Sequence, residues 1–101
     1  MKSMKKVEII IESLYMKRLL KLFEDHSITG YTVIKDLEGY GGHGLKTADD
    51  VTDVFTNILV FTVCDAEVYE KMDKDIRAFL HAYGGKCILT DVMLLLGKQK
   101  R

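Results

Sequence analysis

The sequence contains no proline, has only two cysteines and carries no excess charge of either sign. The absence of proline, together with 48% apolar and 30% charged residues, excludes a disordered tail and indicates an ordered globular protein. Fifteen basic residues balance fifteen acidic ones, so the chain as a whole does not attract nucleic acid or membranes, and any anion must be bound by local groups. We expect one domain, residues 1–101, which would gain stability from oligomerisation.

Long apolar runs and targeting signals are also missing. The basic start is followed by an apolar stretch that Glu8 and Glu12 interrupt, which does not match a signal peptide. No stretch approaches the roughly 20 apolar residues that a membrane-spanning helix needs. Cys64 and Cys87 lack metal-ligand spacing, so we expect both to be buried as small apolar residues. These absences predict a soluble protein of a reducing cytoplasm, with any membrane association arising through a partner.

Periodic patterns predict the order β-α-β, loop, β-α-β. Alternation and β-formers predict strands at 7–12, 31–37, 55–63 and 87–95. Helical spacing predicts one amphipathic helix from Leu14 to about His26, capped by Ser13, and a second between Asp65 and Gly84. This order is typical of a ferredoxin-like α+β sandwich, a four-stranded antiparallel sheet with both helices on one face.

This fold leaves the other face of the sheet without helices. Ile10, Ile34 and one apolar set from each of the last two strands would point to that face. No residues remain to form another layer. We therefore expect further copies of the chain to cover the face in a closed homo-oligomer.

The segment Gly30–Gly44, GYTVIKDLEGYGGHG, runs from a strand into a glycine-rich loop. Glycine has no Cβ and tolerates positive φ, so the backbone N–H groups of such a loop can approach an anionic or planar ligand closely. The loop continues into an acidic run at 49–53. Long loops in compact domains are usually functional or mobile; a solvated hairpin connection is the alternative interpretation.

Two other candidate features contain basic residues. Tyr83-Gly84-Gly85-Lys86 has the donors and the ammonium of a phosphate cradle, although a glycine followed by lysine also ends many helices. The tail Lys98-Gln99-Lys100-Arg101 is either solvated or reaches a neighbouring subunit. His43 has no partner at metal-ligand spacing, and no nucleophile–base pair, Walker lysine motif or carboxylate pair is present. We therefore expect no enzymatic activity.

Three segments, KKVEIIIES, SITGYTVIKDLEGYGGHG and GGKCILTDV, resemble the PII signal-transduction superfamily across nearly the whole chain, and SITGYTV is the most specific of them. The resemblance implies a ferredoxin-like homotrimer whose clefts between subunits bind adenine nucleotides. It also implies a partner-binding T-loop at about 38–53 and a basic tail at 97–101. The implied nucleotide-binding residues are Gly30, Tyr31, Thr32, Gly39, Tyr40, Gly41, Gly84, Gly85, Lys86, Lys98 and Arg101. The implied partner-binding residues are Gly42, His43, Gly44, Lys46, Asp49 and Asp50.

Some positions depart from the family pattern. Tyr83 and Gly84 replace the first two residues of the family's GDGK turn, and Gly97 and Gln99 stand where the family has paired arginines. With fewer cations in register, ADP or AMP is favoured as the ligand. The short T-loop has no tyrosine at its tip, which argues against uridylylation. These features resemble the PII-like proteins found beside carboxysome genes and bicarbonate transporters, which implies bicarbonate as a second ligand.

The sequence therefore predicts a non-enzymatic regulator of a partner such as an inorganic-carbon transporter or an enzyme, with no obligatory cofactor. A metal-sensing or metal-tolerance trimer of the same fold is the alternative, and the scattered histidines and isolated cysteines argue against it. An acylphosphatase would need an arginine and an asparagine after the first strand, where Ser13-Leu14-Tyr15 stands. Nucleic-acid binding is not expected, because the strands lack an exposed aromatic pair with neighbouring arginines.

Overall fold

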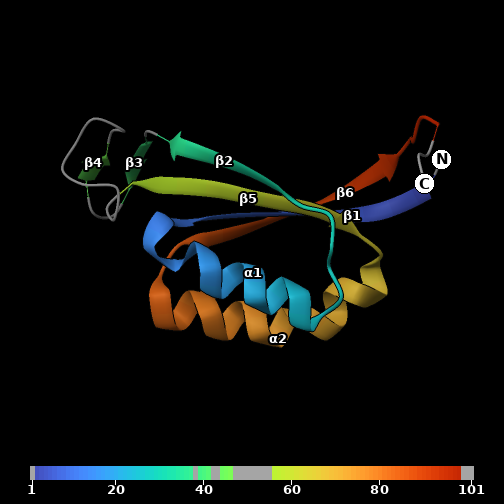
Figure 1. Cartoon of the computed structure of the whole chain (residues 1–101), viewed down its shortest axis with the longest axis horizontal. Coiled ribbons are helices and arrows are strands. Elements are labelled where there is room, and N and C mark those ends of the chain that lie inside the picture. Colours follow the sequence, from blue (N-terminus) through green and yellow to red (C-terminus); the bar gives the residue numbers. More distant parts are fainter. Residues whose placement is uncertain (1, 38, 42–43, 47–55, 99–101) are drawn as a thin grey trace.

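The computed structural model describes residues 2–37, 39–41, 44–46 and 56–98. In these ranges a four-stranded antiparallel sheet has the order β2-β5-β1-β6, and both α-helices pack on one of its faces (Figure 1). The elements of this sandwich are β1 (Lys2–Glu12), α1 (Met16–Asp25), β2 (Thr32–Leu37), β5 (Asn57–Cys64), α2 (Ala66–Tyr83) and β6 (Lys86–Leu94). The structure thus confirms the predicted ferredoxin-like fold.

The core lies between the sheet and the helices, and strict alternation along the strands builds it. Every second residue of β5 from Ile58 to Cys64 is buried, and the residues between them are partly exposed. The helices bury the apolar stripes that the sequence predicted. The buried core residues are Val7, Ile9, Ile11, Leu19, Phe23, Ile28, Ile58, Val60, Cys64, Tyr69, Met72, Ile76 and Phe79. Each large side chain buried in this way contributes about 1.5–3 kcal/mol relative to exposure.

The first strand and first helix begin at other residues than predicted. β1 begins at Lys2 because its first residues pair with β6, with Lys2 opposite Leu94. A 3₁₀ turn, η1 (Ser13–Tyr15), follows β1, so that α1 begins at Met16. The prediction that Ser13 caps a helix is wrong, because Ser13 lies inside this turn and its backbone N–H donates to the Thr56 carbonyl at 2.7 Å.

The second half of the fold follows the prediction more closely. Asp65 stands at the N-cap position of α2, but its side chain makes no capping hydrogen bond. Its carboxylate instead lies 2.8 Å from Nζ of Lys2, which ties the start of β1 to the start of α2. α2 ends at Tyr83, and the N–H of its C-cap residue Gly84 donates to the Leu80 carbonyl at 2.8 Å, as expected for a glycine termination. β5 and β6 each differ from their predicted bounds by one or two residues.

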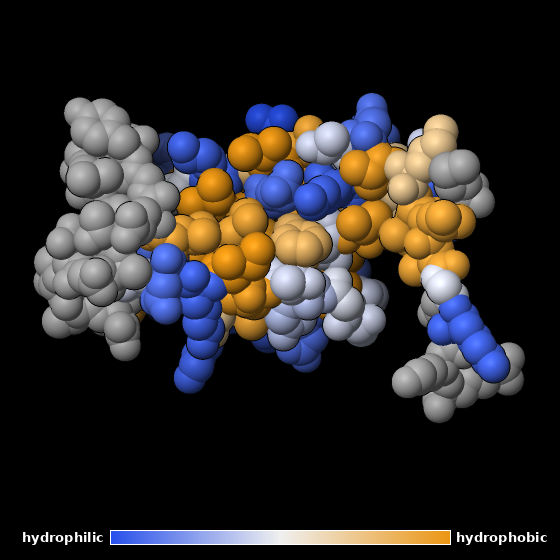
Figure 2. Space-filling model, turned by 90° about the horizontal axis from the view of Figure 1, so that it is seen from above, coloured by the Kyte–Doolittle hydropathy of each residue, from blue (hydrophilic) through white to orange (hydrophobic). Residues whose placement is uncertain are grey.

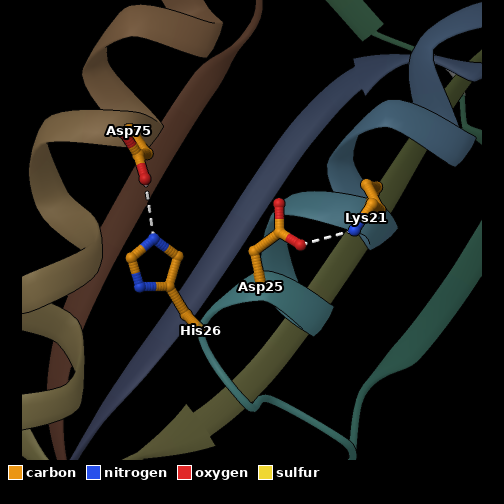
Figure 3. A network of polar contacts seen from close by, with 4 residues as sticks. All are labelled: Lys21, Asp25, His26 and Asp75. Carbon is orange, nitrogen blue, oxygen red and sulfur yellow. Dashed lines mark hydrogen bonds and ion pairs between the residues drawn. The ribbon is translucent and has the colours of Figure 1, made fainter.

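Polar contacts join the two helices at the end of α1 (Figure 3). Nε2 of His26, the C-cap residue of α1, lies 2.7 Å from Oδ2 of Asp75 on α2. One turn earlier, Nζ of Lys21 donates to Oδ1 of Asp25 at 2.6 Å within α1. His26 is only 19% exposed at its side chain, and its contact links the end of α1 to α2.

The face of the sheet opposite the helices carries apolar areas with hydrophilic side chains between them (Figure 2). Ile34 of β2 and Ile88 of β6 are 44% and 46% exposed on it. Phe61 of β5 lies between them, with the ammonium of Lys6 4.9 Å from its ring centroid. The sequence predicted this uncovered apolar face correctly. Exposed patches of this kind mark surfaces that other molecules cover.

Candidate functional site

The segment Gly30 to Thr32 leads into β2, is hydrogen-bonded to β5 and is exposed at its surface. The hydroxyl of Thr62 in β5, which is buried, donates to the Gly30 carbonyl at 2.5 Å. The ring of Tyr31 packs at 6.2 Å from that of Phe23 in α1, yet Tyr31 remains 43% exposed. The structure therefore attaches the predicted adenine-side segment to β5 and α1 while leaving its outer surface accessible.

The turn from α2 into β6 comprises Gly84, Gly85 and Lys86, the first residue of β6, and all three residues are exposed. Gly84 has φ 81° and Gly85 has φ 99°, so both adopt backbone conformations that favour glycine. A Cβ at Gly85 would lie 2.4 Å from the carbonyl oxygen of Ile10, because the turn passes directly against β1. Positive-φ turns can aim backbone N–H groups at an anion, and the Lys86 ammonium supplies the positive charge.

The predicted loop contains a small two-stranded sheet. β3 (Gly39–Gly41) pairs antiparallel with β4 (Gly44–Lys46), with Gly39 opposite Lys46. A register shift interrupts the pairing of β2 with β5 just before the loop, and Asp36 has φ 60° there. The predicted nucleotide-binding residues Gly39, Tyr40 and Gly41 and the predicted partner-binding residues Gly44 and Lys46 thus belong to one hairpin. Gly42, His43, Asp49 and Asp50 lie outside the described residues.

The two candidate halves lie on opposite edges of the sheet. Lys86 pairs with Ile10, Ile10 with Leu59, and Leu59 with Ile34, which crosses the sheet from β6 to β2. Neighbouring strands are about 4.8 Å apart, so these three steps separate the edges by roughly 14 Å. Within one chain, the sheet itself stands between the Gly84–Lys86 turn and the Gly30–Thr32 segment.

The basic tail is described only in part. Lys98 is exposed and follows the end of β6, where Leu94 pairs with Lys2. Lys86 pairs with Ile10, near the opposite end of β1, so Lys98 does not approach Lys86 of its own chain along the sheet. Arg101 lies outside the described residues.

Sequence reasoning missed two features beside the site. Thr62 is the one hydroxyl residue among the buried positions of β5, and this was a signal that its hydroxyl has a specific partner. The other feature is a contact between Tyr83 and Tyr15, whose ring centroids are 4.8 Å apart. Both tyrosines fall on predicted apolar faces of helices, but nothing in the local pattern shows that they meet.

Two shallow grooves flank α1, with volumes of about 500 and 600 Å³. The first reaches Tyr31, and the second lies between the helices and reaches Tyr83. Neither of these two grooves is lined by residues of the Gly84–Lys86 turn.

The main pKa shifts occur at ionisable groups away from the candidate site. Burial raises the pKa of the Cys64 and Cys87 thiols. On α2, the Tyr69 hydroxyl donates to Asp73 at 2.6 Å, and Nε of Arg77 donates to the same carboxylate at 2.7 Å. These two hydrogen bonds lower the pKa of Asp73, and burial together with the carboxylate raises the pKa of Tyr69.

Metal centres and membrane spans are not found within the described ranges. Those residues include no group of three or more histidine, cysteine, aspartate or glutamate side chains placed to hold a metal ion. None of the helices in the described part of the chain is long and apolar enough to cross a membrane.

One comparison with known proteins identifies a family. A family model described as nitrogen regulatory protein P-II matches residues 4–95. No curated protein matches the sequence significantly. A structure of CPII, a nitrogen regulatory PII-like protein from Thiomonas intermedia K12, bound to ADP, AMP and bicarbonate, superposes with a TM-score of 0.83 at 23% identity. That match covers 90% of this chain and 87% of the other.

Two further structures are similar. The apo form of the Thiomonas protein matches with a TM-score of 0.72 at 22% identity, covering 90% of each chain. A PII-like signalling protein from Thermus thermophilus matches with a TM-score of 0.75 at 24% identity, covering 89% of this chain and 87% of the other. At these identities the structural matches establish the shared fold.

Proposed function

Because the chain belongs to the nitrogen regulatory protein P-II family, we propose that it is a non-enzymatic signalling protein that binds adenine nucleotides between the subunits of a homotrimer. The proposal joins the P-II family match with the geometry of the candidate residues. The metal-sensing alternative finds no support, since the family match is to P-II and the described residues hold no metal-ligand cluster.

One observation carries the proposal: the two halves of the candidate site stand on opposite edges of one sheet. The Gly84–Lys86 turn leads into the edge strand β6, and Gly30–Thr32 leads into the edge strand β2. When the β6 edge of one copy adjoins the β2 edge of the next, the phosphate-binding turn and the adenine-side segment face each other. A complete site then requires two chains.

Such an edge-to-edge contact uses a different surface on each partner. Contacts of this type generate either open filaments or closed rings, and a ring satisfies every subunit equally. The apolar open face, with Ile34 and Ile88 near its two edges, would turn inward and be buried in such a ring. A ring of three is the size that the resemblance to PII proteins implies.

We assign the phosphates to the backbone N–H groups of the Gly84–Lys86 turn and to the Lys86 ammonium. The adenine would lie against Gly30, Tyr31 and Thr32 of the neighbouring chain, and Lys98 of a neighbour adds a further cation. The Thiomonas protein was solved with ADP, AMP and bicarbonate, which supports ADP or AMP as the ligand here and bicarbonate as a second one.

The loop at 38–53 would report the bound nucleotide to a partner. β3 and β4 place the predicted base of the nucleotide site and the predicted partner-binding residues Gly44 and Lys46 on the same hairpin. A ligand that contacts one conformation of this hairpin better than another shifts its population. The regulated partner in this proposal is a membrane transporter or an enzyme.

The experiment compares Lys86→Ala with Lys74→Ala, a matched control that removes an exposed lysine from the outer surface of α2. Losing the charge-assisted hydrogen bond of Lys86 should weaken ADP binding by about 1–3 kcal/mol, measured by titration calorimetry, while Lys74→Ala should bind as the unchanged protein does. Unchanged affinity in Lys86→Ala would remove this lysine from the site. An unchanged protein that neither releases heat nor gains thermal stability with AMP, ADP or ATP would overturn the proposed function as a whole.

A further inference from the structure

An aromatic cluster closes the end of the helix layer beside the Gly84–Lys86 turn. The ring of Tyr83, the last residue of α2, lies 5.0 Å from that of Phe79 and 4.8 Å from that of Tyr15 in η1. The guanidinium of Arg18 lies 5.3 Å from the centroid of the Tyr83 ring. Tyr83 therefore contacts its own helix, the 3₁₀ turn after β1, and α1.

The position of Tyr83 in the chain gives this cluster its significance. Its backbone continues directly into Gly84 and Gly85, both with positive φ, and then into Lys86. On the far side, Gly85 passes so close to Ile10 of β1 that no side chain fits there. The turn is thus held from two directions, by the aromatic rings at the helix end and by the backbone of β1.

Restraint of this kind matters for a turn made of glycines. Glycine has the greatest conformational freedom to lose, so an anion that must order two glycines binds more weakly than one that meets them already ordered. The phosphate-binding backbone of the proposed site contains two such residues in succession. A rigid ring immediately before them lowers the ordering cost of binding.

Packing in the core does not account for the arrangement by itself. Tyr83 and Tyr15 are only partly buried and lie at the margin of the core, whereas Phe79 is buried. Arg18 covers the outer side of the Tyr83 ring from an exposed position on α1. Cation–π contacts of this kind at exposed sites contribute modestly to stability, and this one adds a contact from α1 to the ring.

We propose that Tyr83, held by Tyr15 and Arg18, is a positioning residue that orders the Gly84–Lys86 turn for the phosphate groups of the nucleotide. This inference rests on the proposed function, because it concerns the same site. It assigns a role to one of the two positions at which this chain departs from the GDGK pattern. The role predicts an effect that depends on the phosphates of the ligand.

The test measures the affinities of ADP and adenosine in parallel, by competition against a fluorescent ADP derivative. Tyr83→Leu keeps an apolar side chain but removes the ring, and it should weaken ADP binding about tenfold, the equivalent of roughly one lost hydrogen bond. Adenosine has no phosphate, so its affinity should not change. Tyr83→Phe, which keeps the ring, should bind ADP as the unchanged protein does.

A second pair of variants separates positioning from general stability. Tyr15→Leu removes the facing ring from η1 and should reproduce the ADP-selective loss without touching α2. Val68→Ala truncates a partly buried residue in the first turn of the same helix, far along it from Tyr83, and should lower the melting temperature without changing the ratio of ADP to adenosine affinity.

Equal losses for ADP and adenosine in Tyr83→Leu and Tyr15→Leu, or no loss in either variant, would overturn the positioning role. These outcomes differ from a failure of the proposed function, in which the unchanged protein itself binds no adenine nucleotide. If Tyr83→Leu does not fold, Tyr15→Leu decides the question alone.

Discussion

A methyl group at Gly85 would collide with β1, and this predicts a graded series of stabilities. The ideal Cβ position lies 2.4 Å from the Ile10 carbonyl oxygen and 2.8 Å from Cγ2 of Ile11, at a φ of 99°. Gly84 has φ 81° but open space around its Cβ position. Gly30 has open space and no positive φ. A substitution at Gly85 therefore causes both atomic overlap and backbone strain, one at Gly84 causes backbone strain alone, and one at Gly30 causes neither.

The magnitudes follow from these differences. Backbone strain at a residue other than glycine costs about 1–3 kcal/mol, so Gly84→Ala should lower the free energy of unfolding by about that amount. Overlap with packed atoms costs about 1–3 kcal/mol more, so Gly85→Ala should lose about 2–6 kcal/mol, a large fraction of the roughly 5–15 kcal/mol of a typical domain. Gly30→Ala should change stability by less than about 1 kcal/mol.

Urea denaturation followed by far-ultraviolet circular dichroism measures the series. All variants are compared at one protein concentration, because oligomerisation makes apparent stability concentration-dependent. A Gly85→Ala protein no less stable than Gly84→Ala would refute the reasoning, since it would mean that the turn moves away from β1 at no cost.

Two other predictions concern β5. Thr62→Val removes the hydroxyl that donates to the Gly30 carbonyl, so it should lower the free energy of unfolding by about 1 kcal/mol and weaken ADP binding in titration calorimetry. An unchanged ADP affinity would show that this hydrogen bond does not support the nucleotide site. Burial, with the charge of Asp65 as a smaller cause, raises the pKa of the Cys64 thiol. Because the thiol ionises more readily in the unfolded chain, the protein keeps its full stability below the pKa of the unfolded thiol, about 8.5. It loses stability as the pH rises from there toward the higher pKa of the folded state. Cys64→Ala should therefore lose less stability than the unchanged protein between neutral and alkaline pH in denaturation series; parallel losses would contradict it.

The fold could be predicted because its signals are local. The alternation in β5 and the helical stripe from Tyr69 to Phe79 each specify an element from nearby residues alone. The ends of the strands and helices were harder to predict, because they depend on contacts with residues distant in sequence. β1 extends to Lys2 because β6 pairs with it there. Ser13 lies in a 3₁₀ turn, and its backbone N–H donates to the carbonyl of Thr56, which is distant in sequence.

The residues of the candidate site could be named from the sequence, but their arrangement could not. Gly84, Gly85 and Lys86 have the composition of an anion-binding turn wherever the chain places them. Their position on the edge opposite Gly30 depends on strand order, which no local pattern contains. The contact between Tyr15 and Tyr83 likewise depends on how two helices approach each other.

The placement of the two half-sites on opposite edges has a genetic consequence. In the proposed ring, each cleft takes its phosphate turn from one subunit and its adenine-side segment from the next. Consider two alleles, one altered at Lys86 and the other at Gly30, each of which abolishes every cleft when expressed alone. In any trimer that mixes the two products, one junction joins the intact turn of one product to the intact segment of the other. The two alleles would therefore complement each other within a single assembly, whereas two alleles altered on the same edge would not.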